Sequence, residues 1–256
     1  MHHFYIDEYS ELKSPLHRFD PRVKIITFFS FILFVIFTSP HSYFTFLLYG
    51  CVLCALIGLS RIPWRFVLVH SLVIIPFVLM VAVFIPFLKK GQIAGAYSFG
   101  SINLTITYDG IAVFWNILVK SYLSIVCVIL MMASTKFTHF LRALENMRIP
   151  NIFTMILSFM YRYVFVIADE LMEMRQAKEA RSIGGTKWFH TKVLANMLGV
   201  LFIRAYEKGE SVYLAMCARG FQGAIKTIDR LKISGFDIMF SCIIFAVLIS
   251  IKIFAG

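Results

Sequence analysis

The amino-acid sequence predicts an all-α polytopic membrane protein with five or six transmembrane helices and a pair of helices on the cytoplasmic side. Of its 256 residues, 59% are hydrophobic and 15% are charged, whereas about 25% of residues are charged in soluble domains. The apolar residues gather in long runs, and a polar, basic insert interrupts them late in the chain. The net charge of +11 indicates membrane topology, because lysine and arginine collect on the cytoplasmic side, and no nucleic-acid partner is predicted.

The first 24 residues are polar and basic, and they predict a cytoplasmic N-terminal arm over residues 1–24. No early apolar core is present, so no cleavable signal peptide is predicted. Asp20 precedes Pro21, which predicts a helix with an aspartate N-cap and a proline in its first position. The first membrane helix is then expected to begin near residue 22.

Four transmembrane helices are predicted within residues 25–134, each from an apolar run that is bounded by a turn or a charged segment. The runs cover residues 25–38, 43–59, 66–88 and 111–133. Pro76 and Pro86 are expected to bend the third helix. Residues 89–109 contain several glycines and are predicted to form an outside loop.

Residues 135–233 are predicted to form a cytoplasmic or membrane-associated helical domain, because they carry fifteen Lys and Arg together with eight Asp and Glu. Phe137–Met147 has the pattern of a short amphipathic helix. Residues 151–168 are apolar enough to cross the membrane, but a full crossing would put the basic segment that follows outside, so partial embedding is favoured. Residues 234–256 are predicted to form a C-terminal transmembrane helix.

One local pattern occurs twice in the polar insert. The first copy ends in Ala180, Arg181 and Ser182, the second ends in Ala218, Arg219 and Gly220, and a shift of 38 residues superposes them. Each copy predicts a helix that begins with acidic residues and ends at the arginine. An ordinary helix C-cap would explain one such copy, because arginine complements the helix dipole and glycine commonly follows the last turn. Two copies favour a pair of arginine-tipped helices that a partner recognises.

Lys120 lies in the middle of the fourth apolar run, where an ionisable side chain is a functional candidate. The alternative is that its ammonium group snorkels or faces a polar bundle interior. Cys51 and Cys54 lie in an apolar run without the further ligands that a zinc site needs. The sequence contains no phosphate-binding loop, no His-Glu-x-x-His and no Gly-x-Ser-x-Gly, so no catalytic residue, resident metal or cofactor is predicted.

Over nearly its whole length the chain resembles the transmembrane T component (EcfT) of energy-coupling factor transporters, and specifically the cobalt-type CbiQ branch. Two features carry the resemblance: the two Ala-Arg-Gly motifs and the segment from Ser14 to Lys24, which includes Asp20, Pro21 and Arg22. The first motif departs from the family pattern, because Ser182 stands where the family has glycine, but it keeps its arginine.

The resemblance implies a non-catalytic subunit of an ABC-type importer in a bacterial or archaeal cell membrane. Its implied partners are two ATP-binding cassette ATPase subunits, a CbiM-like membrane substrate-binding component and membrane lipid. Its implied cargo is a transition-metal ion, with cobalt favoured, nickel next and a vitamin as a further alternative. The two motifs would end a pair of coupling helices, Arg181 and Arg219 would dock into the ATPases, and their small neighbours would permit close approach.

Three other functions are left open by the residues themselves. The first is the permease of an ordinary ABC importer, although such a permease usually has a single coupling segment. The second is a membrane-embedded enzyme that uses Lys120 or the histidines His2 and His3. The third is a membrane scaffold without a role in transport.

Overall fold

The computed structural model describes residues 14–40, 42–88, 93–99, 102–147, 149–181, 187–221, 223 and 234–255. These residues fall into two compact units, each of which is described by itself. The bundle unit lies within Phe4–Phe140 and Leu231–Gly256, and the long-helix unit lies within Leu141–Arg230. The residues His2 and His3 lie outside the described part of the chain.

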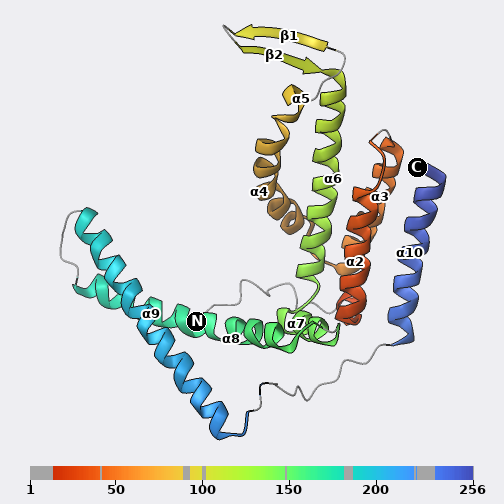
Figure 1. Cartoon of the computed structure of the whole chain (residues 1–256). Helices are drawn as coiled ribbons and strands as arrows, with labels where there is room; N and C mark the ends of the chain where they lie inside the picture. The colour runs from red at the N-terminus through yellow and green to blue at the C-terminus, as the bar shows by residue number, and fades with distance from the viewer. Residues whose placement is uncertain are drawn as a thin grey trace. The chain divides into compact units, whose positions relative to one another are not determined.

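The bundle unit contains most of the apolar helices and one small sheet (Figure 1). Its elements are α1 Pro15–Arg18, α2 Pro21–Ile36, α3 Tyr43–Ser60, α4 Trp64–Ala82, α5 Ile85–Leu88, β1 Ile93–Phe99, β2 Ile102–Thr107, α6 Tyr108–Ala133 and α10 Gly235–Ala255. Among the described residues, five helices are long and apolar enough to cross a membrane: α3, α4, α6, α10 and α8 of the long-helix unit. The prediction of an all-α polytopic membrane protein is therefore confirmed, apart from the small sheet.

The start of α2 follows the prediction from the sequence. Asp20 is its N-cap, the Asp20 side chain accepts a hydrogen bond of 2.9 Å from the Arg22 N–H, and Pro21 occupies the first turn. Within the predicted N-terminal arm, Leu16 and Lys24 are each 1% exposed and pack within the bundle unit. Helix α2 has 16 residues, about 24 Å of helix, which is less than the roughly 30 Å of a hydrocarbon core.

The predicted third span is divided into α4 and α5. Helix α4 contains Pro76 but ends at Ala82, four residues before Pro86. A proline cannot donate a hydrogen bond to the carbonyl four residues earlier, and its ring crowds that carbonyl. The helix therefore ends where the Pro86 ring would meet it.

Within the predicted outside loop, the described residues 93–99 and 102–107 form the two strands of a β hairpin, which precedes α6 (Figure 1). Strands β1 and β2 pair antiparallel, with Phe99 opposite Ile102 and Ile93 opposite Thr107. The alternating isoleucine, leucine and threonine of β2 suit a strand, and the prediction of a loop gave this pattern too little weight. The start of α6 approaches α5 so closely that a Cβ on Gly110 would lie 2.7 Å from the Pro86 Cα.

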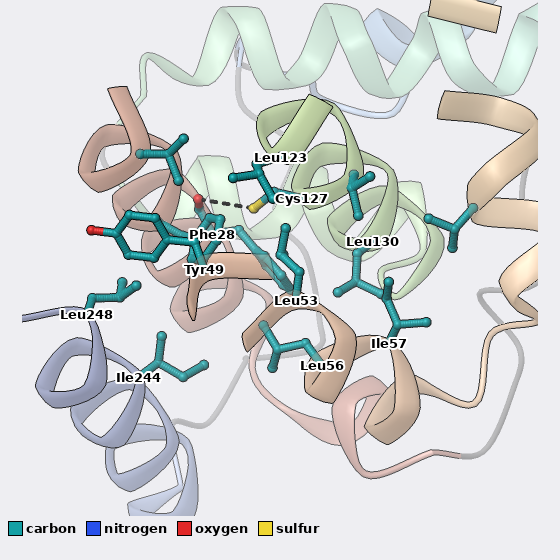
Figure 2. Close-up of a cluster of buried hydrophobic side chains, with 14 of the residues drawn as sticks. Phe28, Tyr49, Leu53, Leu56, Ile57, Leu123, Cys127, Leu130, Ile244 and Leu248 are labelled. Carbon is teal, nitrogen blue, oxygen red and sulfur yellow. Dashed lines mark hydrogen bonds between the residues drawn. The ribbon is translucent and has the colours of Figure 1, made fainter. Parts of the chain in front are cut away.

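The core of the bundle unit lies among α2, α3, α6 and α10 (Figure 2). Phe31 of α2 meets Tyr49 of α3 edge to face, with ring centroids 5.7 Å apart. Leu130 of α6 and Leu248 of α10 are fully buried in the same cluster. Lipid tails are as apolar as these side chains, so close packing and polar contacts hold membrane helices together more than the hydrophobic effect does.

The long-helix unit is built from two long continuous helices, α8 Asn151–Arg181 and α9 Lys187–Ala218. Each predicted copy of the repeat is the C-terminal part of one of these helices, so the helices do not begin at the acidic residues. The amphipathic segment forms α7 Phe137–Asn146.

Candidate functional site: the tips of two crossed helices

Helices α8 and α9 cross one another, and an ion pair joins them near the crossing (Figure 1). The Arg204 guanidinium of α9 contacts the Glu170 carboxylate of α8. At 1.5 Å per residue, Arg181 lies about 16 Å beyond Glu170 on α8, and Arg219 lies about 22 Å beyond Arg204 on α9. Each helix therefore carries its arginine at the end of a long arm beyond the contact.

Both arms expose apolar as well as polar side chains. Met172 on α8 is 51% exposed, and Tyr213 and Leu214 on α9 are 56% and 59% exposed. Among the described residues of α8, Thr154 alone is buried. Large exposed apolar surfaces of this kind mark sites that contact another protein or the membrane.

The first tip ends at its arginine, as the sequence predicts. Arg181 is the last residue of α8, and Ala177 and Ala180 are exposed beside it. One turn earlier, Arg175 donates a hydrogen bond of 2.9 Å to the Glu179 carboxylate, four residues along the same helix. Ser182, the departure from the family motif, lies outside the described residues.

The second tip is closed by a glycine in the left-handed conformation. Gly220 has φ +80°, and its N–H donates to the Cys217 carbonyl at 3.0 Å. The Phe221 N–H donates to the Met216 carbonyl at 3.1 Å. These two bonds form a Schellman C-cap, so the ordinary capping role applies to Gly220. The exposed Arg219 side chain takes no part in these backbone bonds, and in the described part of the chain neither arginine tip has an ion-pair partner.

Replacing Gly220 with alanine is expected to loosen this cap, because a side chain in the left-handed region costs about 1–2 kcal/mol. Hydrogen exchange should become faster at the Gly220 and Phe221 positions, while the rest of α9 keeps its protection. Gly199→Ala is the matched control, since Gly199 lies inside α9 and a Cβ at this position would meet no neighbouring side chain within 4 Å, and alanine favours the helix interior. Unchanged exchange in Gly220→Ala would show that the tip does not depend on this cap.

A second polar cluster lies in the bundle unit, where Asp20 begins α2. The Asp237 carboxylate, at the start of α10, accepts the Asp20 N–H at 3.2 Å and the Ser234 N–H at 2.7 Å. Lys24 is attracted by the carboxylates of both Asp237 and Asp20. Arg22 lies beside them, with its Nε 4.0 Å from Asp20. The structure thus brings the predicted Asp20, Pro21 and Arg22 together with two residues that were not predicted.

Asp237 and Lys24 were missed for different reasons. Lys24 was counted as one of the basic charges of a cytoplasmic arm, although it is 1% exposed. Asp237 has a recognisable signal, because Ser234 and Asp237 have the spacing of a capping box ahead of an apolar run. The sequence could not show that the same carboxylate also accepts the N–H of Asp20, the N-cap residue of α2.

Lys120 lies in α6, apart from both arginine tips along the chain. Its ammonium group donates to the Ile36 carbonyl at 2.8 Å and to the Thr38 carbonyl at 2.7 Å. It also lies 5.9 Å from the centre of the Phe46 ring. The alternative of a polar bundle interior therefore describes Lys120 well, since its donors are directed at backbone oxygens.

Comparison with known proteins places this architecture in a family. The model of the family described as "CbiQ: Cobalt transport protein" matches residues 12–229. The chain belongs to the CbiQ family. It is thereby a transmembrane T component of the energy-coupling factor type, in the cobalt-type branch.

Three curated relatives of this CbiQ-family chain illustrate the relationship. The energy-coupling factor transporter transmembrane protein EcfT of Ruminiclostridium cellulolyticum is 26% identical over 248 residues, which cover 91% of this chain and 90% of the relative. The EcfT protein of Bacillus subtilis is 25% identical over 229 residues, covering 85% and 84%. The putative fused cobalt transport protein CbiMQ of Methanocorpusculum labreanum is 25% identical over 218 residues, covering 84% of this chain and 36% of the fused protein.

The described residues of the CbiQ-family chain contain no group of three or more His, Cys, Asp or Glu that could hold a metal ion. The five cysteines are unpaired, and Cys127 is the buried one.

Proposed function

We propose that the chain is the coupling subunit of an energy-coupling factor importer, which transmits the motion of two ATPase subunits to a membrane substrate-binding component. The observation that carries this proposal is the pair of arginine-tipped helices, crossed at the Glu170–Arg204 ion pair. Each tip presents a planar guanidinium, which binds carboxylates and carbonyls in a fixed geometry. Two equivalent tips suit two equivalent partners.

The geometry of the crossed helices suggests how motion would pass between partners. A helix is stiff over its length, so displacement of a tip moves the opposite end of the same helix. The arms between the crossing and the tips are about 16 Å and 22 Å long. When ATP draws the two ATPases together, the tips would move with them, and the crossed pair would tilt against the substrate-binding component.

The exposed apolar side chains of the long helices support the second half of this proposal. Phe202 of α9 is 75% exposed, and Ile156 and Met160 of α8 are 55% exposed. A substrate-binding component would cover such surfaces, and methionine adapts to contacts that change during a cycle. The remaining surface would face lipid in the bacterial or archaeal cell membrane.

The transported ion is proposed from the family and its relatives. The family is described as cobalt transport protein, and one relative is named as a fused cobalt transport protein. Cobalt is therefore the proposed cargo, with nickel next. The chain itself would act without catalysis, since ATP hydrolysis belongs to the partner ATPases.

Purification of the affinity-tagged chain from membranes of its native host tests the proposal. We expect two ATP-binding cassette subunits and one polytopic membrane protein to co-purify with the chain, identified by mass spectrometry. Recovery of a stable chain without any ATPase would contradict the coupling function and favour the scaffold. Recovery of ATPases without a separate membrane component would favour an ordinary ABC permease.

A further inference from the structure

Helices α2 and α6 run antiparallel in the bundle unit and are joined by side chains that bind the backbone of the opposite helix. Lys24 of α2 donates to the Ser134 carbonyl at 2.9 Å, at the C-terminal end of α6. Lys120 of α6 donates to the Ile36 carbonyl at 2.8 Å, at the C-terminal end of α2. Each helix therefore supplies a lysine that binds the last turn of the other.

A third contact lies between these two lysines. The Cys127 thiol of α6 donates to the Phe28 carbonyl of α2, with the sulfur and oxygen 3.5 Å apart (Figure 2). The partners on α2 are residues 24, 28 and 36, while those on α6 are 134, 127 and 120. Positions rise along one helix as they fall along the other, so all three contacts belong to a single antiparallel register.

The two lysines bind carbonyl groups that the helices cannot satisfy themselves. The last four carbonyls of a helix have no partner within it. Helix α2 has 16 residues, about 24 Å of helix, which is too short to cross a hydrocarbon core of roughly 30 Å. Its C-terminal end is therefore expected to lie inside the core. Lys120 lies about 21 Å from Ser134 along α6, so it reaches this end at a depth where water is scarce and unsatisfied carbonyls are costly.

A cation at a helix C-terminus is also favoured by the helix dipole. Lys120 also donates a hydrogen bond of 2.7 Å to the Thr38 carbonyl, just beyond the end of α2. The Thr38 hydroxyl donates to the Phe34 carbonyl at 2.8 Å. The carbonyl groups at the end of α2 therefore accept hydrogen bonds from Lys120 of α6 and from the Thr38 hydroxyl that follows α2.

We propose that Lys24, Cys127 and Lys120 form an interhelical ladder in which the two lysines act as reciprocal C-caps that fix the axial register of α2 on α6. This ladder assigns Lys120 a positioning role and removes it from the residues available for transport chemistry or catalysis. A sliding of α2 along α6 would break all three contacts at once. The two helices therefore behave as one rigid element within the bundle unit.

The reactivity of Cys127 reports on this register, because Cys127 is fully buried while Cys51, Cys54, Cys217 and Cys242 are exposed. In membranes containing the full chain with the four exposed cysteines replaced by alanine, the rate of Cys127 modification by N-ethylmaleimide is measured. Lys120→Met and Lys24→Met are expected to raise this rate at least tenfold. Lys120→Arg keeps donors for the same carbonyls and is expected to stay within twofold of the parent.

Two control variants separate register from general loosening. Lys252 of α10 contacts the Phe34 ring at 5.7 Å and binds no carbonyl of the ladder, so Lys252→Met should label like the parent. Leu248→Ala removes a fully buried side chain of α10 and lowers stability without touching the ladder. Equal labelling of Lys120→Met and the parent, or equally fast labelling of Leu248→Ala, would overturn the proposal. If Lys24→Met does not accumulate in membranes, Lys120→Met with its Lys120→Arg rescue decides the question.

Discussion

Reversing both arginine tips, with Arg181→Glu and Arg219→Glu in one chain, is expected to abolish co-purification of the ATPase subunits. A docked guanidinium would be largely removed from water, and losing one partner of such a contact costs about 2–5 kcal/mol. Each single reversal should therefore weaken docking roughly 30-fold or more, and the double reversal should leave no measurable complex. The fraction of ATPase recovered with the tagged chain is the measurement.

The control for this experiment reverses two other exposed charges of the same helix pair. Lys192 and Lys208 are exposed on α9, away from its tip, so Lys192→Glu with Lys208→Glu changes the net charge by the same amount. This variant should retain the ATPases, and both variants should keep the parent melting temperature because all four side chains are exposed. Wild-type recovery by the double arginine variant would refute docking through the tips, and equal loss in both variants would point to general electrostatic attraction.

Replacing Asp237 with alanine is expected to produce the largest loss of stability in the bundle unit. Asp237 is 5% exposed, and its carboxylate accepts hydrogen bonds from the N–H groups of Asp20 and Ser234. A hydrogen bond to a charged group contributes about 1.5–3 kcal/mol, so losing both of these bonds costs about 3–6 kcal/mol. In detergent the melting temperature should fall by roughly 6–24 °C, as measured by fluorescence or light scattering.

Asp109 provides a matched control for this substitution. It is also an aspartate in the first turn of an apolar helix, but it is exposed at the start of α6. Asp109→Ala loses an interaction with the helix dipole worth about 0.3–1 kcal/mol, so its effect should be several times smaller. Equal melting temperatures for the two variants would show that the Asp237 carboxylate makes no special contribution to the bundle.

Several features could be predicted from the sequence because the physics that sets them is local. The apolar runs predict membrane helices, Asp20 and Pro21 predict the start of α2, and the Ala-Arg pattern predicts that a helix ends at Arg181. Each rests on residues close together in the chain. The end of α4 before Pro86 could also have been predicted from the sequence, because proline has no N–H to donate to the carbonyl four residues earlier.

The tertiary structure decided the features that depend on residues far apart in the chain. The sequence shows Lys120 as a charge in an apolar run, and it equally allows transport, catalysis or a structural contact. The choice depends on the carbonyls of Ile36 and Thr38, which are brought to Lys120 by the antiparallel packing of α2 and α6. Lys24 likewise changes from a charge of the predicted N-terminal arm to a buried donor to Ser134 of α6, and Asp237 of α10 becomes a buried acceptor for the Asp20 N–H.

The composition and order of the residues by themselves determined a polytopic helical membrane protein with two equivalent arginine motifs, because apolar runs, caps and repeats act within a few turns of helix. The tertiary structure decided that these motifs end two long crossed helices and that the buried charges join three helices of the bundle. The physical reason is that a charge or a backbone carbonyl within the membrane is costly unless it is hydrogen-bonded or paired. The packing of the helices decides which group supplies that contact.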